Sequence, residues 1–192
     1  MLTIDTLIRY SNGSLLTRLE EVTTDGVEVP IYDHVMMSYD KGVFHHLPHE
    51  PKWMKLPNNH KGKIVQAGQI VMNMMTTECV IVSERHEGSI LPYNYTLIEI
   101  DEKRLDSQYL VYWFNMSPSA QAQLNQFMQG GSLVKKLTLN HLKQIKIQPP
   151  PLKKQKLIGR IAAYRKRQKY LYQKKQYLMD QFLVEQLLRE EY

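Results

Sequence analysis

The chain has 192 residues, of which 43% are hydrophobic and 23% charged; this composition is typical of a folded domain and excludes a disordered chain. It contains no apolar run of membrane-spanning length and no pattern typical of a secretory leader, so we expect a cytoplasmic protein. Cys79 is the single cysteine, which excludes an internal disulfide and a thiolate zinc site. The net charge of +6 lies in the tail, because residues 152–192 hold 11 Lys and Arg against 4 Asp and Glu, and the first 151 residues are nearly neutral.

The first hundred residues are predicted to form short strands. Four segments rich in Val, Ile and Tyr are separated by turn residues: VEVPIYDHVMM (27–37), GKIVQAGQIVMNM (62–74), CVIVSE (79–84) and YTLIEI (95–100). Residues 45–63 mix prolines with polar and aromatic residues without a clear period, and we interpret them as a long surface loop. The pattern predicts a twisted, mainly antiparallel sheet.

Helical patterns begin at Asp106. Residues 106–116 have apolar residues at helical spacing behind an Asp-Ser cap, which predicts a buried helix. A second helix is expected from Ser117, which can cap it, to Gly130, which is placed to end it. A short helix capped by Thr138 and the strand IKIQ (145–148) follow. Three prolines at 149–151 remove three amide donors, so the sheet cannot continue past them.

From Leu152 to the end, the residues are nearly all good helix formers, and a long helix is predicted. Apolar residues repeat along it at alternating four- and three-residue steps, interrupted by Gln168 and Lys175. This heptad seam predicts a coiled coil with a partner helix, formed by Leu157, Ile161, Tyr164, Leu171, Leu178 and Phe182. The alternative is that the helix folds back onto its own domain.

In this order of features the chain resembles the specificity subunit of type I restriction-modification systems. The resemblance rests on GQIVMN, PYNYTLIEI, QYLVYWFN, GGSLVKKL and, above all, LNHLKQIKIQPPPLKKQKLI at the junction with the long helix. It implies an α+β target recognition domain over residues 1–150 and a spacer and dimerisation helix over residues 151–192. Family members usually carry two recognition domains, each reading one part of a bipartite site. A chain with one of each is then expected to be a half-subunit that pairs with a second copy or another fragment, or a truncated fragment.

The resemblance further implies a non-catalytic protein that binds double-stranded DNA and on which methyltransferase and restriction subunits dock. No cofactor is expected, because the sequence has no glycine-rich nucleotide loop, and the prolines at 149–151 lack the flanking residues of an adenine methyltransferase motif. The triplet Asp101-Glu102-Lys103 fits a loose nuclease pattern that often arises by chance. One alternative is a protein-interaction adaptor. Another is a self-contained nuclease or methyltransferase, and the missing motifs argue against it.

Candidate DNA contacts are lysines that can neutralise phosphates, polar side chains that can read base edges, and glycines that allow close approach. They are Lys61, Lys63, Asn73, Thr76, Thr77, Arg85, His86, Tyr93, Asn94, Gly130, Gly131, Ser132, Lys135 and Lys136. A helix stop followed by solvated lysines explains the 130–136 segment equally well. The loop histidines His45, His46 and His49 lack the spacing of a zinc pair and are expected to be exposed; no metal site is predicted.

Overall fold

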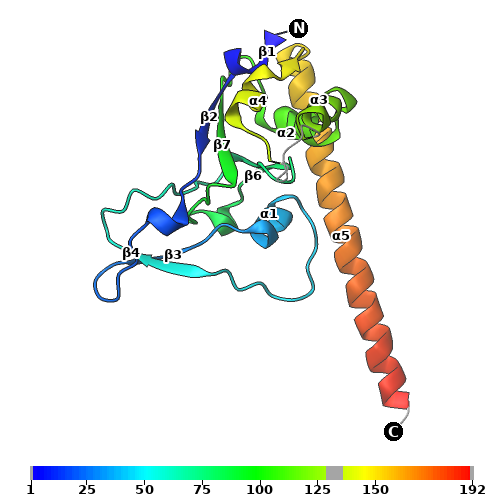
Figure 1. The fold of residues 1–192 in the computed structure, drawn as a ribbon. Helices are drawn as coiled ribbons and strands as arrows, with labels where there is room; N and C mark the ends of the chain where they lie inside the picture. The colour runs from blue at the N-terminus through cyan, green and yellow to red at the C-terminus, as the bar shows by residue number, and fades with distance from the viewer. Residues whose placement is uncertain (1, 129–135, 191–192) are drawn as a thin grey trace.

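The computed structural model describes residues 2–128 and 136–190, and its centre is a four-stranded antiparallel sheet (Figure 1). The strands are β2 (Ile8–Asn12), β7 (Tyr95–Ile100), β5 (Ile70–Asn73) and β6 (Cys79–Ile81), in that spatial order. β7 has the bounds predicted for it, whereas β5 and β6 are shorter than the apolar segments that contain them. The prediction of an α+β fold with an antiparallel sheet is confirmed.

Both faces of this sheet are buried at β5, which explains the unbroken apolar run in that strand. Successive side chains of a strand point to opposite faces. Val71 and Leu97 therefore pack in a core with Tyr32, whereas Met72 and Ile98 pack in a second, larger core beneath the helices.

Two predictions for residues 27–63 are wrong. The expected strand over 27–37 ends at Pro30 as β3 (Val27–Pro30), and the chain then enters the helix α1 (His34–Asp40). The carboxylate of Asp33 caps this helix, accepting from Val35 N and Met36 N, each at 2.9 Å. The expected loop over 45–63 contains the strand β4 (Trp53–Leu56), which pairs antiparallel with β3.

The remaining short elements connect the sheet to its ends. β1 (Leu2–Thr3) pairs antiparallel with β8 (Lys146–Ile147), so the start of the chain meets the strand that precedes the prolines. Single turns of 3-10 helix are formed by η1 (Ile4–Thr6), η2 (Leu16–Arg18) and η3 (Glu84–His86).

The three predicted helices before the prolines are present. α2 (Ser107–Met116) begins behind Asp106, which accepts from Tyr109 N at 2.9 Å, and α3 (Pro118–Met128) follows it. α4 (Leu139–Gln144) begins with a capping box, in which Thr138 and His141 satisfy each other's backbone amides. The proposed helix end at Gly130 lies outside the described residues.

The long helix α5 (Leu152–Glu190) contains 39 residues, about 58 Å at 1.5 Å per residue, and extends well past the sheet (Figure 1). Its first turns pack against α2. Gln155 is buried there, and its side chain bonds to three backbone groups: it accepts from Asp106 N at 3.0 Å and donates to Arg104 O at 3.0 Å and Pro150 O at 2.8 Å. We call this junction the elbow. Over residues 2–128 and 136–190, no helix is both long and apolar enough to cross a membrane.

Candidate nucleic-acid interface

Several of the predicted DNA contacts meet at one end of the four-stranded sheet. The turn after β5 joins the turn before β7, because Met74 N donates to Asn94 O at 2.8 Å. Leu137 N in turn donates to Met74 O at 2.8 Å, which brings Lys136 to the same place. The ammonium of Lys136 lies 3.9 Å from the centre of the Tyr93 ring, a cation–π contact.

Lys63 lies beside this group. Its backbone amide donates to the Ser14 hydroxyl at 2.6 Å, and its carbonyl accepts from Leu91 N at 2.7 Å, next to the turn that carries Tyr93. The exposed Lys61 precedes it by two residues. We call the group formed by Lys61, Lys63, Thr76, Thr77, Tyr93, Asn94 and Lys136 the sheet-end surface. Its ammonium, hydroxyl, amide and aromatic groups suit contacts to phosphates and base edges.

Asn73 shapes this surface from within. It is only 5% exposed, and its side-chain oxygen accepts from Met75 N at 2.8 Å and Thr76 N at 3.2 Å. Thr77, which closes the turn, has a φ of 61°, a left-handed conformation that is rare for a β-branched residue. Asn73 is thus engaged in holding a strained turn, and we leave it out of the proposed contacts.

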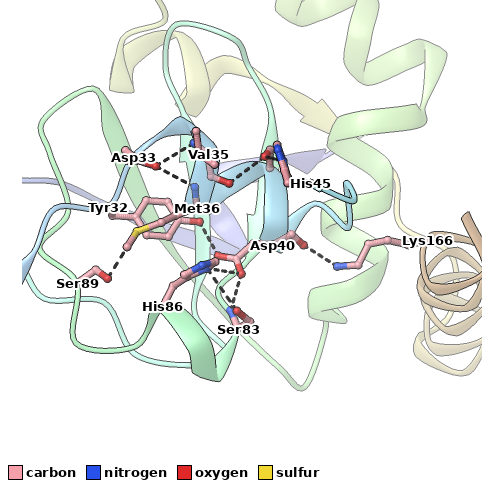
Figure 2. A network of polar contacts seen from close by, with 11 residues as sticks. Tyr32, Asp33, Val35, Met36, Asp40, His45, Ser83, His86, Ser89 and Lys166 are labelled. Carbon is pink, nitrogen blue, oxygen red and sulfur yellow. Dashed lines mark hydrogen bonds and ion pairs between the residues drawn. The ribbon is translucent and has the colours of Figure 1, made fainter. Parts of the chain in front are cut away.

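His86 is also placed in the interior. It is 3% exposed, and its Nδ1 lies 2.9 Å from Asp40 Oδ1 (Figure 2). The same carboxylate accepts from Ser83 N at 3.1 Å and from the Tyr32 hydroxyl at 2.7 Å. Burial, followed by the neighbouring Asp40 charge, raises the pKa of Tyr32. A histidine held in this network has a structural role, so we leave it out of the proposed contacts as well.

Arg85 is exposed but lies apart from the sheet-end surface, in η3 beyond the other end of β6. Its guanidinium lies 4.3 Å above the Tyr39 ring, and that ring lies 4.6 Å from the ring of His45. Tyr39 is not among the predicted contacts, because nothing in residues 38–44 of the sequence indicates the helix end that presents it. The predicted contacts Gly130, Gly131, Ser132 and Lys135 lie outside the described residues.

The loop histidines have three separate partners. His45 contacts the Ser38 hydroxyl, His46 stacks on the Tyr177 ring at 5.5 Å, and His49 pairs with Asp33 at 2.7 Å. In the described part of the chain, no group of three His, Cys, Asp or Glu side chains could hold a metal ion. Cys79 is fully buried, as expected for a core residue, and burial raises the pKa of its thiol.

The predicted seam lies on the free side of α5. Its six apolar side chains are 47% to 66% exposed: Leu157, Ile161, Tyr164, Leu171, Leu178 and Phe182. Another stripe of α5 contacts the domain, and it consists of Gln155, Gly159, Lys166, Tyr170, Gln173 and Tyr177. At about 100° per residue, the two stripes are centred about 160° apart on the helix. One face of α5 therefore lies against the domain, and the pairing predicted for the seam on the opposite face stays a prediction.

This combination of a sheet-centred domain and a long helix agrees with a known family. The model of the type I restriction modification DNA specificity domain family matches residues 21–178, so the chain belongs to that family. The match extends from the sheet-centred domain through most of α5. No curated protein matches the chain.

Two solved structures have the same fold. One is a chain from a study of complex assembly and conformational transition in the type I R-M system, with a TM-score of 0.57, 15% identity and 97% of this chain covered. The other is the HsdS subunit from Thermoanaerobacter tengcongensis, with a TM-score of 0.55, 13% identity and 91% of this chain covered. This chain spans 50% and 38% of their lengths.

Proposed function

We propose that the chain recognises a DNA sequence as one half of a type I restriction-modification specificity subunit. The observation that carries this proposal is the family match over residues 21–178, which includes most of the sheet-centred domain and most of the helix. Residues 1–150 are the DNA-binding domain and residues 151–192 the spacer helix. The sheet-end surface contributes phosphate and base contacts, and Arg85 contributes a further contact from beyond β6.

In this proposal two copies pair through the seam of α5. Six apolar side chains exposed on one helix face support pairing, because each one buried against a partner contributes roughly 1.5 to 3 kcal/mol. Two identical domains held apart by paired helices would read a palindromic bipartite site. Methyltransferase and restriction subunits would dock on this assembly and perform the catalysis, so that the chain itself is no enzyme. Pairing with another specificity fragment is the alternative to a homodimer.

The test is selection from a library of duplexes that carry two randomised segments separated by spacers of different lengths. The purified full chain is mixed with the library, and bound duplexes are sequenced, with and without a cognate methyltransferase subunit. We expect enrichment of two inverted copies of one short sequence at one spacer length. Bound duplexes with the composition of the starting library would overturn sequence recognition.

A second candidate function is a protein-interaction adaptor whose domain does not read DNA. The near-neutral charge of residues 1–151 favours it, because most DNA-binding domains present a basic surface. The same selection separates the two functions, since an adaptor enriches no sequence while still binding other subunits through α5.

A further inference from the structure

α5 is attached to its domain at two separate places. The first is the elbow, where Gln155 is enclosed between the prolines and the start of α2. The second lies farther along the helix, where residues 40–46 meet α5 between Lys166 and Tyr177. We call this second contact the clamp. Lys166, where the clamp begins, follows Gln155 by 11 residues, or about 17 Å of helix, and Tyr177, where it ends, lies about 33 Å from Gln155. About three turns of helix therefore separate the two attachments.

The polar part of the clamp joins α5 to the last residue of α1. The ammonium of Lys166 donates to the backbone carbonyl of Asp40 at 2.7 Å (Figure 2). Asp40 cannot move freely, because its fully buried carboxylate is held by Tyr32, Ser83 and His86. Partial burial lowers the pKa of Lys166, and the nearby Asp40 charge opposes this effect.

Close contact at Gly42 completes this part. Gly42 has a φ of +84°, and a Cβ atom added there would lie 2.5 Å from Cγ of Lys166. The chain therefore passes directly over the lysine stem at a position that glycine alone fills without strain. The loop and α5 are therefore closely packed at this point.

The aromatic part of the clamp comes from the loop after α1. The ring of Phe44 lies 5.7 Å from that of Tyr170 and 5.5 Å from that of Tyr177, and His46 stacks on Tyr177 at 5.5 Å. The amide of Phe44 donates to the side chain of Gln173 at 3.4 Å. Each aromatic pair contributes about 0.5 to 1.5 kcal/mol beyond the area that it buries.

We propose that the clamp fixes the angle of α5 to the recognition domain and thereby selects the spacing between two DNA half-sites. This inference rests on the proposed function. A helix held at the elbow alone can tilt, and a 10° tilt displaces a point 40 Å away by about 7 Å, roughly two base-pair steps of 3.4 Å. Lys166 and Phe44 are thus positioning residues, whose removal relaxes spacer selection without removing a contact to DNA.

The first experiment measures the angle directly. Spin labels are attached through Glu99→Cys in the central strand β7 and Asp180→Cys on α5, both exposed, while the buried Cys79 stays unlabelled. Labelled chain is mixed with excess unlabelled chain, so that a dimer holds one labelled pair. We expect one narrow distance distribution for the parent and a broader one after Phe44→Ala with Lys166→Ala. An unchanged distribution would overturn the clamp.

The second experiment measures spacer selection on duplexes that carry the selected half-sites with spacers changed by one or two base pairs. The clamp variant is expected to lose about tenfold of the discrimination between the best spacer and its neighbours, with unchanged affinity for an isolated half-site. The matched control is Leu47→Ala with Lys169→Ala, one loop and one helix residue, both exposed and outside the clamp. Discrimination equal to that of the control would overturn the role in spacing. If the parent selects no sequence, the proposed function fails, whereas the label distances still decide whether the clamp holds α5.

Discussion

Gln155 joins three pieces of backbone at the elbow, which explains why an amide is required there. Its oxygen accepts one bond and its NH₂ group donates two, to the loop before α2 and to the proline segment. A carboxylate of the same shape could only accept, and would face two carbonyl oxygens. The residue type follows from the donors and acceptors that surround it.

Replacing Gln155 is therefore expected to destabilise the fold. Gln155→Ala leaves three backbone groups without their partner, and each unsatisfied buried group costs about 1 to 3 kcal/mol where water cannot reach it. We expect a loss of at least about 2 kcal/mol in the free energy of unfolding, and a larger loss for Gln155→Glu, as measured by urea denaturation. Gln168→Ala, exposed on the same helix, is the control. Equal stability of the Gln155 and Gln168 variants would contradict this role.

Lys136 offers a test of the sheet-end surface at the level of single charges. If Lys135 and Lys136 each neutralise one phosphate, removing both lowers the slope of log K against log salt by about 1.8. Lys135→Ala with Lys136→Ala should weaken binding to all sequences alike, measured by titration at several salt concentrations. The neighbouring pair Lys153 and Lys154, exposed on α5, serves as a charge-matched control. A slope that does not differ from the parent's would remove both lysines from the interface.

The helix α5 is unusual because one of its faces packs closely against the domain and the opposite face carries exposed apolar residues. On the face toward the domain, Gln155 and Lys166 make hydrogen bonds and Gly159 allows close approach, whereas the opposite face carries the large apolar residues of the seam. Gly159 shows how closely α5 approaches the domain. A Cβ atom at this position would lie 2.8 Å from Asp106 Oδ1, Gln108 Cβ and Tyr109 N, so α5 meets the start of α2 without room for a side chain.

This contact reverses the usual effect of a glycine substitution. In an exposed helix interior, Gly→Ala stabilises by about 1 kcal/mol. Gly159→Ala is instead expected to destabilise the protein, because the added methyl group meets the backbone of Tyr109 and pushes α5 away from α2. Thermal unfolding followed by circular dichroism shows whether the substitution raises or lowers the melting temperature. A higher melting temperature for this variant would show that the two helices can separate without cost.

The sequence predicts those helices and strands whose ends are set by residues close to them in the chain. α2 and α4 begin behind Asp106 and Thr138 as expected, because a cap and an apolar period act within a few residues. The residues of α1 are instead predicted to form a strand, because their apolar, β-branched surroundings outweigh the cap at Asp33. β4 lay within an expected loop, since its pairing with β3, more than twenty residues away in the chain, leaves no local period.

The candidate site was predictable only in part, and the reason lies in long-range packing. Several of the lysines and threonines predicted to contact DNA lie together at one end of the sheet, and their contact with DNA stays a prediction. His86 looked equally accessible in the sequence, but it bonds to Asp40, 46 residues earlier, in the interior. The clamp was not predicted for the same reason, because Asp40 and Lys166 are 126 residues apart. The family resemblance, in contrast, rests on short local motifs, above all the one at the helix junction, and is confirmed by the match.

For the whole molecule, the arrangement of parts suggests how recognition and assembly are kept independent. The domain uses one face of α5 for its attachment and leaves the opposite face exposed. The sheet-end surface is formed by turns of the sheet and by residue 136, and involves no residue of α5. A partner helix on the seam would therefore leave both the clamp and the proposed DNA contacts in place, so that pairing and DNA recognition can be altered separately.

This independence gives a test of the oligomeric state. Leu171→Glu with Leu178→Glu places two charges on the seam, where a partner helix would have to bury them, and we expect the dimer to become a monomer in light scattering. Lys169→Glu with Gln176→Glu introduces the same residue at two exposed positions outside the seam and should leave the mass unchanged. Because all four side chains are exposed in the single chain, the melting temperature of the monomer should stay close to that of an isolated copy of the parent at high dilution. A parent chain that is already monomeric at all concentrations would rule out the homodimer and leave a different specificity fragment as the partner for this face.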